Sequence, residues 1–145
     1  MILSAQQLFS DDQAVTATAI SENVIDLGVR GTPYDAAAAL IGDKGKGNPI
    51  PVLVQVTEDF ATLTSLTLTL ETSAAAGLTS PTVLASQTIV AADLVAGKQL
   101  NVQFLPNGAT GRYLGLRYTV TGSNASAGKI TAGISMGNQT NQYGA

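Results

Sequence analysis

The residue types that carry most enzyme chemistry are missing from this chain or stand in unpromising surroundings. Its 145 residues include no histidine and no cysteine. The usual general base, the thiolate nucleophile and the common zinc ligands are therefore absent. A serine–lysine pair remains formally available, but the four lysines are scattered and single out no serine. We expect no catalytic residue.

Two carboxylate pairs, Asp11–Asp12 and Glu58–Asp59, are the remaining candidates for acid–base chemistry. Neighbours in a strand point to opposite faces, and neighbours in a loop are usually just solvated. Neither pair has the spacing of a calcium loop, and "GDKGKG" at 42–47 lacks the spacing of a phosphate loop. We interpret 42–51 as a flexible, lysine-bearing surface loop. We expect no enzyme activity, no cofactor and no metal site.

The chain carries unusually little charge. Charged residues make up 12% of it, against about 25% in an ordinary domain. The seven basic residues are scattered, whereas a nucleic-acid binder needs them clustered. No stretch approaches the length of a membrane span, and the N-terminus lacks the features of a signal peptide. We expect neither nucleic acid nor membrane as a partner. The neutral surface indicates either a covering partner or simply an unusually neutral β-domain.

The elements that would position any site are strands. Apolar residues alternate with polar ones along most of the chain, with almost no helical period. This pattern predicts an all-β sandwich or barrel of about eight strands. We expect an N-terminal arm at 1–15, a β-domain at 16–137 and a polar tail at 138–145, with turns at 105–111 and 122–129. The segments with the pattern are 13–21, 23–29, 51–57, 64–72, 82–90, 99–105, 111–121 and 129–137.

The strand "GRYLGLRYTVT" at 111–121 has two unlike faces. One row is mostly apolar, and the other contains Tyr113, Gly115 and Arg117. A strand face meant only for water usually carries more charge. Since interfaces are rich in Tyr and Arg, one hypothesis places Tyr113 and Arg117 in a subunit contact. The alternative is that Tyr113 packs at a sheet edge and Arg117 pairs with a neighbouring strand.

The N-terminal arm is the second candidate interface. Ile2, Leu3, Leu8 and Phe9 are too apolar to remain in water. They either complete the domain's own core or lie on a neighbouring subunit, for example by strand addition. We favour the interface slightly.

Three blocks of sequence, in this order, resemble a known family. They are "LFSDDQAVTATAISENVIDLG", "LTLTLETS…SPTVLASQTI" and "LPNGATGRYLGLRYTVTG…AGKITAGIS". Together they are similar to the jelly-roll capsid cement proteins of tailed phages, in particular the head-stabilising type of a short-tailed Bordetella phage. The similarity covers most of the chain, and residues 29–51 match least.

The resemblance implies a jelly-roll fold and a structural role without catalytic residues. Such proteins sit on the outer surface of the phage head as homo-oligomers (here a dimer or a trimer) and bridge subunits of the major capsid protein. They are made in the bacterial cytoplasm and end in the virion. The alternative is a carbohydrate- or receptor-binding jelly roll of a tail or fibre. The absence of Trp and the small number of Tyr and Phe disfavour that alternative.

Overall fold

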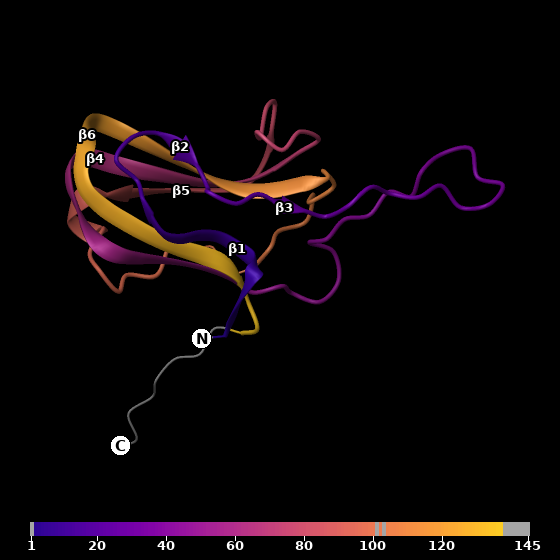
Figure 1. Cartoon of the computed structure of the whole chain (residues 1–145), viewed down its shortest axis with the longest axis horizontal. Helices are drawn as coiled ribbons and strands as arrows, with labels where there is room; N and C mark the ends of the chain where they lie inside the picture. The colour runs from indigo at the N-terminus through magenta and orange to yellow at the C-terminus, as the bar shows by residue number, and fades with distance from the viewer. Residues whose placement is uncertain (1, 101, 103, 138–145) are drawn as a thin grey trace, which may run out of the picture.

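The computed structural model describes residues 2–100, 102 and 104–137 and shows an all-β protein (Figure 1). Its strands are antiparallel, and one short 3-10 helix, η1, follows β5. The fold class expected from the alternating pattern is confirmed. The elements are β1 (Leu3–Ala14), β2 (Ala19–Ile20), β3 (Ile25–Asp26), β4 (Val52–Ser73), β5 (Thr82–Val90), η1 (Ala91–Asp93) and β6 (Tyr113–Ser135).

Two long strands, β4 and β6, form the frame of the molecule. They pair with each other from Val52 opposite Ile134 to Ser73 opposite Tyr113. The order in the sheet is β1-β6-β4-β5, and β2 and β3 also pair with β6. The β4–β6 ribbon bends in the middle, so its two halves lie in different layers of a sandwich (Figure 1). One half carries β1, and the other carries β2, β3 and β5.

The bend accounts for much of the difference between the roughly eight strands predicted and the six found among the described residues. The predicted strands at 51–57 and 64–72 lie in the two halves of β4, and those at 111–121 and 129–137 lie largely in the two halves of β6. The prediction of a hairpin connection at 122–129 is wrong, because β6 runs through this segment. Gly128 has a φ of 135° there. A Cβ on Gly128 would lie 2.3 Å from the ring of Phe60, so only glycine fits this bend.

The core fills the space between the two halves of the ribbon. Leu66, Leu68 and Leu70 alternate with polar residues and have no exposed surface. Each such side chain contributes about 1.5–3 kcal/mol when it is fully buried. The other large, fully buried members of this core are Phe9, Val52, Leu94, Leu114, Leu116, Tyr118, Ile130 and Val15.

The N-terminal segment is extended, as expected, but it is strand β1 of the sheet and pairs with β6. Phe9 is 0% exposed and belongs to the core, so its assignment to an interface is wrong. Leu3 and Leu8 are half-buried, and only Ile2 remains largely exposed.

A buried polar network also fixes β1. The hydroxyl of Ser10 lies 2.8 Å from that of Tyr118 and donates to Gln13 Oε1 at 2.6 Å. Burial raises the pKa of Tyr118, so its phenol stays protonated.

Two strands were predicted between β4 and β6, and the structure confirms the first of them. The strand at 82–90 coincides with β5. The one at 99–105 is reduced to two isolated bridges, Gln55 with Gln99 and Pro51 with Phe104. Leu100 and Val102 in this segment are nevertheless buried. Asn101, Gln103 and the expected polar tail at 138–145 lie outside the described residues.

Candidate interaction surface

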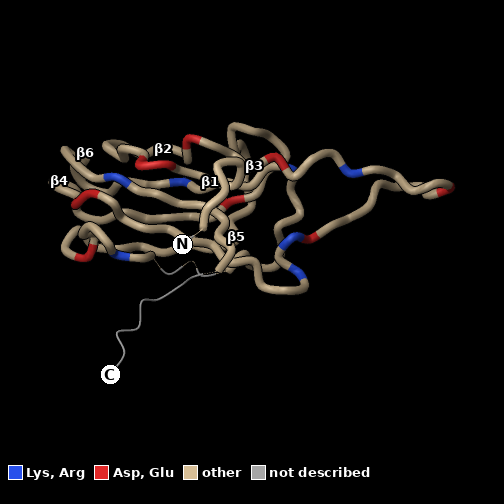
Figure 2. The backbone as a smooth tube through the Cα atoms, turned by 60° about the horizontal axis from the view of Figure 1, so that its bottom comes forward, with Lys and Arg blue, Asp and Glu red and all other residues tan. Residues whose placement is uncertain are grey.

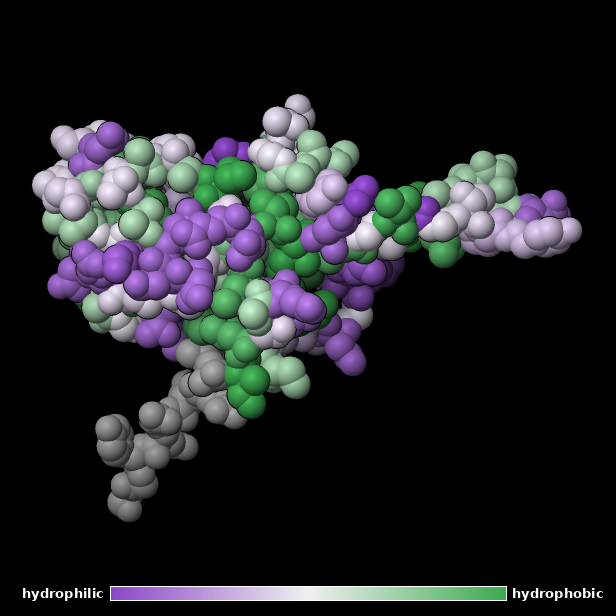
Figure 3. Space-filling view, viewed as in Figure 1, coloured by the Kyte–Doolittle hydropathy of each residue, from purple (hydrophilic) through white to green (hydrophobic). Residues whose placement is uncertain are grey.

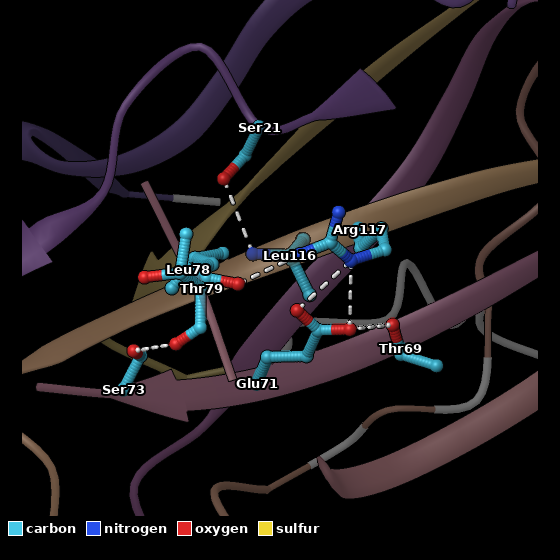
Figure 4. Close-up of polar contacts among 8 residues, drawn as sticks. All are labelled: Ser21, Thr69, Glu71, Ser73, Leu78, Thr79, Leu116 and Arg117. Carbon is cyan, nitrogen blue, oxygen red and sulfur yellow. Dashed lines mark hydrogen bonds and ion pairs between the residues drawn. The ribbon is translucent and has the colours of Figure 1, made fainter. Parts of the chain in front are cut away.

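The second face of β6 is covered by the chain's own loops. Arg117 Nε donates to both carboxylate oxygens of Glu71 on β4, at 3.0 and 3.1 Å, and Arg117 Nη2 donates to the carbonyl of Leu78 at 3.0 Å (Figure 4). Thr69 donates to the same carboxylate at 2.8 Å. The Glu71 side chain is 4% exposed and that of Arg117 is 30% exposed. Pairing with a neighbouring strand therefore accounts for Arg117.

Gly115 makes room for one of these loops. A Cβ at Gly115 would lie 2.8 Å from the side chain of Leu78, which is 1% exposed. The hydroxyl of Ser21 accepts a hydrogen bond of 3.1 Å from the backbone N–H of Leu116 (Figure 4). The Tyr–Gly–Arg row thus positions the loops at 74–81 and 21–24.

Tyr113 is half-buried at the end of the same row. The Arg112 guanidinium lies 4.9 Å from the centre of its ring and binds Asp26 with two hydrogen bonds, of 2.8 and 2.7 Å. A hydrogen bond from Arg112, with a second from the backbone N–H of Gly28, lowers the pKa of Asp26 to about 2. A subunit contact at Tyr113 stays a prediction.

The most exposed apolar surface lies in a segment that the sequence did not single out. Residues 28–42, which we call the finger, project far from the sandwich as an irregular loop (Figure 1). Its two arms are joined by a hydrogen bond of 3.1 Å from Leu40 N–H to the carbonyl of Gly31. Tyr34 is fully exposed, and Val29, Leu40 and Ile41 are 80%, 61% and 87% exposed. Hydrophobic residues are visible where the finger leaves the sandwich (Figure 3).

The base of the finger is anchored by Asp43. Its carboxylate accepts backbone N–H groups from Gly108 at 2.7 Å and from Gly45 and Ala109 at 3.0 Å. These bonds, led by that from Gly108, lower the pKa of Asp43. The segment at 42–47, interpreted from the sequence as a flexible surface loop, is thus bonded through Asp43 to the turn at 105–111.

Arg30 anchors the other arm of the finger. Its Nη2 donates to the carbonyl of Gly42 at 2.7 Å and to that of Thr110. Because Arg30 and Asp43 hold both arms, the finger is a projection with a fixed root. "RGTPY" followed by "GDKGKG" gave no signal of this, since both contacts are to backbone groups distant in sequence.

A shallow pocket of about 350 Å³ lies at this root. Both arginines that line it are already bonded, Arg30 to backbone carbonyls and Arg112 to Asp26. The lining contains the hydroxyl of Thr110 but no carboxylate that could act as a base beside it. The lining residues are Gly28, Val29, Arg30, Ala74, Thr110, Gly111 and Arg112.

A smaller apolar patch lies at one end of the sandwich. Ile2, Phe104 and Met136 are 66%, 50% and 83% exposed. They belong to neighbouring segments, because Met136 N–H donates to the carbonyl of Ile2 and Pro51 bridges to Phe104. Ile2 is thus the one predicted interface residue that lies clearly on the surface.

Charge does not gather into a site. Acidic and basic residues are spread over the chain without a basic stripe (Figure 2). Among the described residues no group of three potential ligands of the His, Cys, Asp and Glu types is close enough to hold a metal. The described part of the chain also contains no helix of the length and apolarity needed to span a bilayer.

These features define a class: a small, weakly charged antiparallel β-sandwich that projects an apolar finger from an anchored root. The chain belongs to the Bbp16 family, whose sequence profile matches residues 9–134. Bbp16 is the name of a Bordetella phage protein, and the chain is therefore a phage-derived protein. No curated protein is similar enough to the chain to count as a match.

Proposed function

We propose that the chain is an external capsid cement protein, which bridges subunits of the major capsid protein and stabilises the DNA-filled phage head. Membership of the Bbp16 family carries this proposal. In this proposal the protein lies on the outer surface of the virion and has no catalytic role, no cofactor and no nucleic-acid or membrane partner.

The finger supports the proposal at the level of side chains. Val29, Leu40 and Ile41 expose much apolar surface to water. Its burial against another protein surface is favourable. A full side chain of this size contributes about 1.5–3 kcal/mol when it becomes buried. Because both arms of the finger are anchored at its root before contact, less conformational entropy is lost when the finger binds. We assign the finger to the contact with the major capsid protein.

The sandwich supports it at the level of the whole molecule. The long β4–β6 ribbon links both layers, so the body can carry a load between two contacts without hinging. As a homo-oligomer on a repeating surface, the protein combines several modest contacts into strong attachment. Neither property depends on a reactive group.

The test is binding to heads that lack the protein. Purified protein is co-sedimented with such heads, and the bound copies are counted by quantitative mass spectrometry. We expect saturation at an integer ratio to the major capsid protein and improved survival of the heads on heating. A handful of copies per particle would contradict the proposal and indicate a tail or fibre protein, to be examined next for glycan binding.

A matched pair of variants tests the finger. Ile41→Ser removes an apolar side chain from it, and Val95→Ser removes a half-exposed one from the body. We expect the first to weaken head binding several-fold and the second to leave it unchanged, with equal thermal midpoints. Equal binding by both variants would remove the finger from the capsid contact.

A further inference from the structure

The turn at 105–111 contains the one Asn–Gly pair of the sequence, Asn107–Gly108. The turn requires the glycine, because Gly108 has a φ of 100°, which residues with a Cβ rarely adopt. Asparagine is common beside such a glycine, since its short polar side chain suits a turn. Asn107 is exposed to water and Gly108 is half-buried.

An asparagine before a glycine is also a chemical liability. Asn is a thermolabile residue, and glycine has no Cβ to shield its backbone nitrogen. In deamidation this nitrogen attacks the side-chain amide carbon of the asparagine. The attacking nitrogen loses its proton to water, the amide nitrogen leaves as ammonia, and a succinimide ring forms. Water then opens the ring to aspartate or to isoaspartate, whose backbone is longer by one carbon, so the net reaction consumes water and releases ammonia.

In the folded chain the attacking nitrogen is held by Asp43. The Gly108 N–H donates to Asp43 Oδ2 at 2.7 Å, and the N–H of Ala109 donates to Oδ1 at 3.0 Å. We call these two bonds the Asp43 clamp. Gly45 packs on the same turn, because a Cβ at Gly45 would lie 2.8 Å from the backbone nitrogen of Asn107. The reacting nitrogen is therefore fixed in orientation.

The carboxylate of Asp43 opposes the reaction in two ways. It accepts a hydrogen bond through the proton that must leave, and it places a negative charge beside the nitrogen that would become negative. It is also too weak a base to remove that proton, since a carboxylate is far less basic than an amide anion. The bond from Gly108, which leads the causes that lower the pKa of Asp43, makes the carboxylate a weaker base still.

We propose that Asn107 is a deamidation site that the Asp43 clamp keeps unreactive, and that isoaspartate at this position releases the root of the finger. The longer backbone of the product cannot keep both the close packing against Gly45 and the bonds to Asp43. Because the released ammonia is lost, a molecule whose root has opened and reacted does not regain its anchor. This inference goes beyond the proposed function and requires no capsid contact.

The first experiment measures the rate of deamidation. Wild type, Asp43→Ala and Arg30→Ala are incubated in mildly alkaline buffer, and the peptide that contains Asn107 is followed by mass spectrometry. Asp43→Ala should react about tenfold faster than wild type, since a hydrogen bond to a charged group no longer holds the nitrogen. Arg30→Ala is the matched control, because it removes bonds at the root but keeps that from Gly108 to Asp43. Equal rates in wild type and Asp43→Ala, or an equally fast Arg30→Ala, would overturn the proposal.

A comparison within wild type does not depend on how any variant folds. The same protein is incubated folded and in guanidinium chloride, where the Asp43 clamp is absent. We expect Asn107 to react much faster in the unfolded chain. Equal rates would show that the fold gives this site no protection.

The third experiment tests the effect of the product on the finger. Deamidated wild type carries one more negative charge and is separated by anion exchange, and isoaspartate in it is identified by enzymatic carboxyl methylation. Amide hydrogen exchange in the finger should be faster in this fraction than in the unmodified fraction. Identical exchange in the two fractions would contradict release of the root.

Discussion

Among the ion pairs of the described residues, that of Arg117 and Glu71 is the one whose carboxylate is buried. Glu71 accepts hydrogen bonds from Thr69 and Arg117 and is almost completely buried. Removal of one partner from a buried ion pair leaves an uncompensated charge, which costs more than the intact pair contributes. The carbonyl of Leu78 would lose a donor as well.

We expect Arg117→Ala to lower the free energy of unfolding by about 2 kcal/mol, below the usual range for a buried pair because the arginine is partly exposed. Chemical denaturation measures this. Arg112→Ala, which breaks the exposed pair with Asp26, should have a much smaller effect. Equal losses from the two variants would show that Glu71 is solvated after all.

Asp26 should make the stability of the protein depend on pH at the acid end. Its pKa is about 2 in the folded chain, below its ordinary value of 3.8. The folded state therefore holds the ionised form more strongly, and this stabilisation is full above about pH 4 and is lost as the pH falls towards 2. Asp26→Asn should be less stable than wild type at about pH 6, and the difference should shrink at about pH 2.5. Thermal melts at both values check this, and a constant difference would contradict it.

At the residue scale, the sequence pointed to candidate residues but not to the contacts that they make. The two unlike rows of 111–121 pointed to Arg117 and to two alternative roles for it. No pattern pointed to Glu71 or to the loop that carries Leu78. Phe9 was misplaced because an apolar residue near a terminus has the same appearance in a core as in an interface. Only the pairing of β1 with β6 decides between these.

At the scale of elements, the bend in β4 and β6 determines the architecture. The ladder shifts register between Val56 and Ser65 of β4, and glycines of β6 occupy the inside of the bend. Bulges and glycines are the usual devices for turning a strand from one sheet into another. The sequence showed strand segments on each side of the bend, but its glycine-rich middle has the composition of a turn.

Gly128→Ala should damage this bend. The residue would need a positive φ, and its Cβ would collide with the ring of Phe60. We expect a loss of at least about 2 kcal/mol in unfolding free energy, combining backbone strain with displaced core packing. Gly31→Ala, with an ordinary φ and open space around it, should be nearly neutral. A neutral Gly128→Ala would mean that the bend is not held by this contact.

The root of the finger gives a second prediction at this scale. Asp43→Ala removes the acceptor of three backbone N–H groups. We expect the sandwich to stay folded while amide hydrogen exchange in the finger and in the turn at 105–111 becomes faster. Lys46→Ala, next to the same turn of chain, is the control. Unchanged exchange in the Asp43 variant would show that Arg30 alone holds the root.

At the scale of the whole molecule, the low charge sets how binding responds to salt. The net charge is −3, and the finger between its anchors carries mainly small and apolar side chains. Contacts of this kind are screened little by ions. Head binding should therefore change less than about threefold between about 50 and 500 mM NaCl. Co-sedimentation at both concentrations measures it, and a steep loss of binding would indicate a charged interface instead.

The sandwich as a whole was predictable because alternation is a local signal, repeated in almost every segment. Its surface was not. The conformation of the exposed finger depends on bonds from Arg30 and Asp43 to distant loops.

The continuous β4–β6 ribbon also governs when the protein can fold. Its partners are distant in sequence even at their closest, with Ser73 opposite Tyr113. Loop closure on this scale must precede any gain from pairing, so folding should be slow for a chain of this size. Because β6 supplies partners to β1, β2, β3 and β4, the β4–β5 pair is the one pairing among the described strands that can form before β6 is available. The two layers of the sandwich are therefore completed together, once β6 has been made.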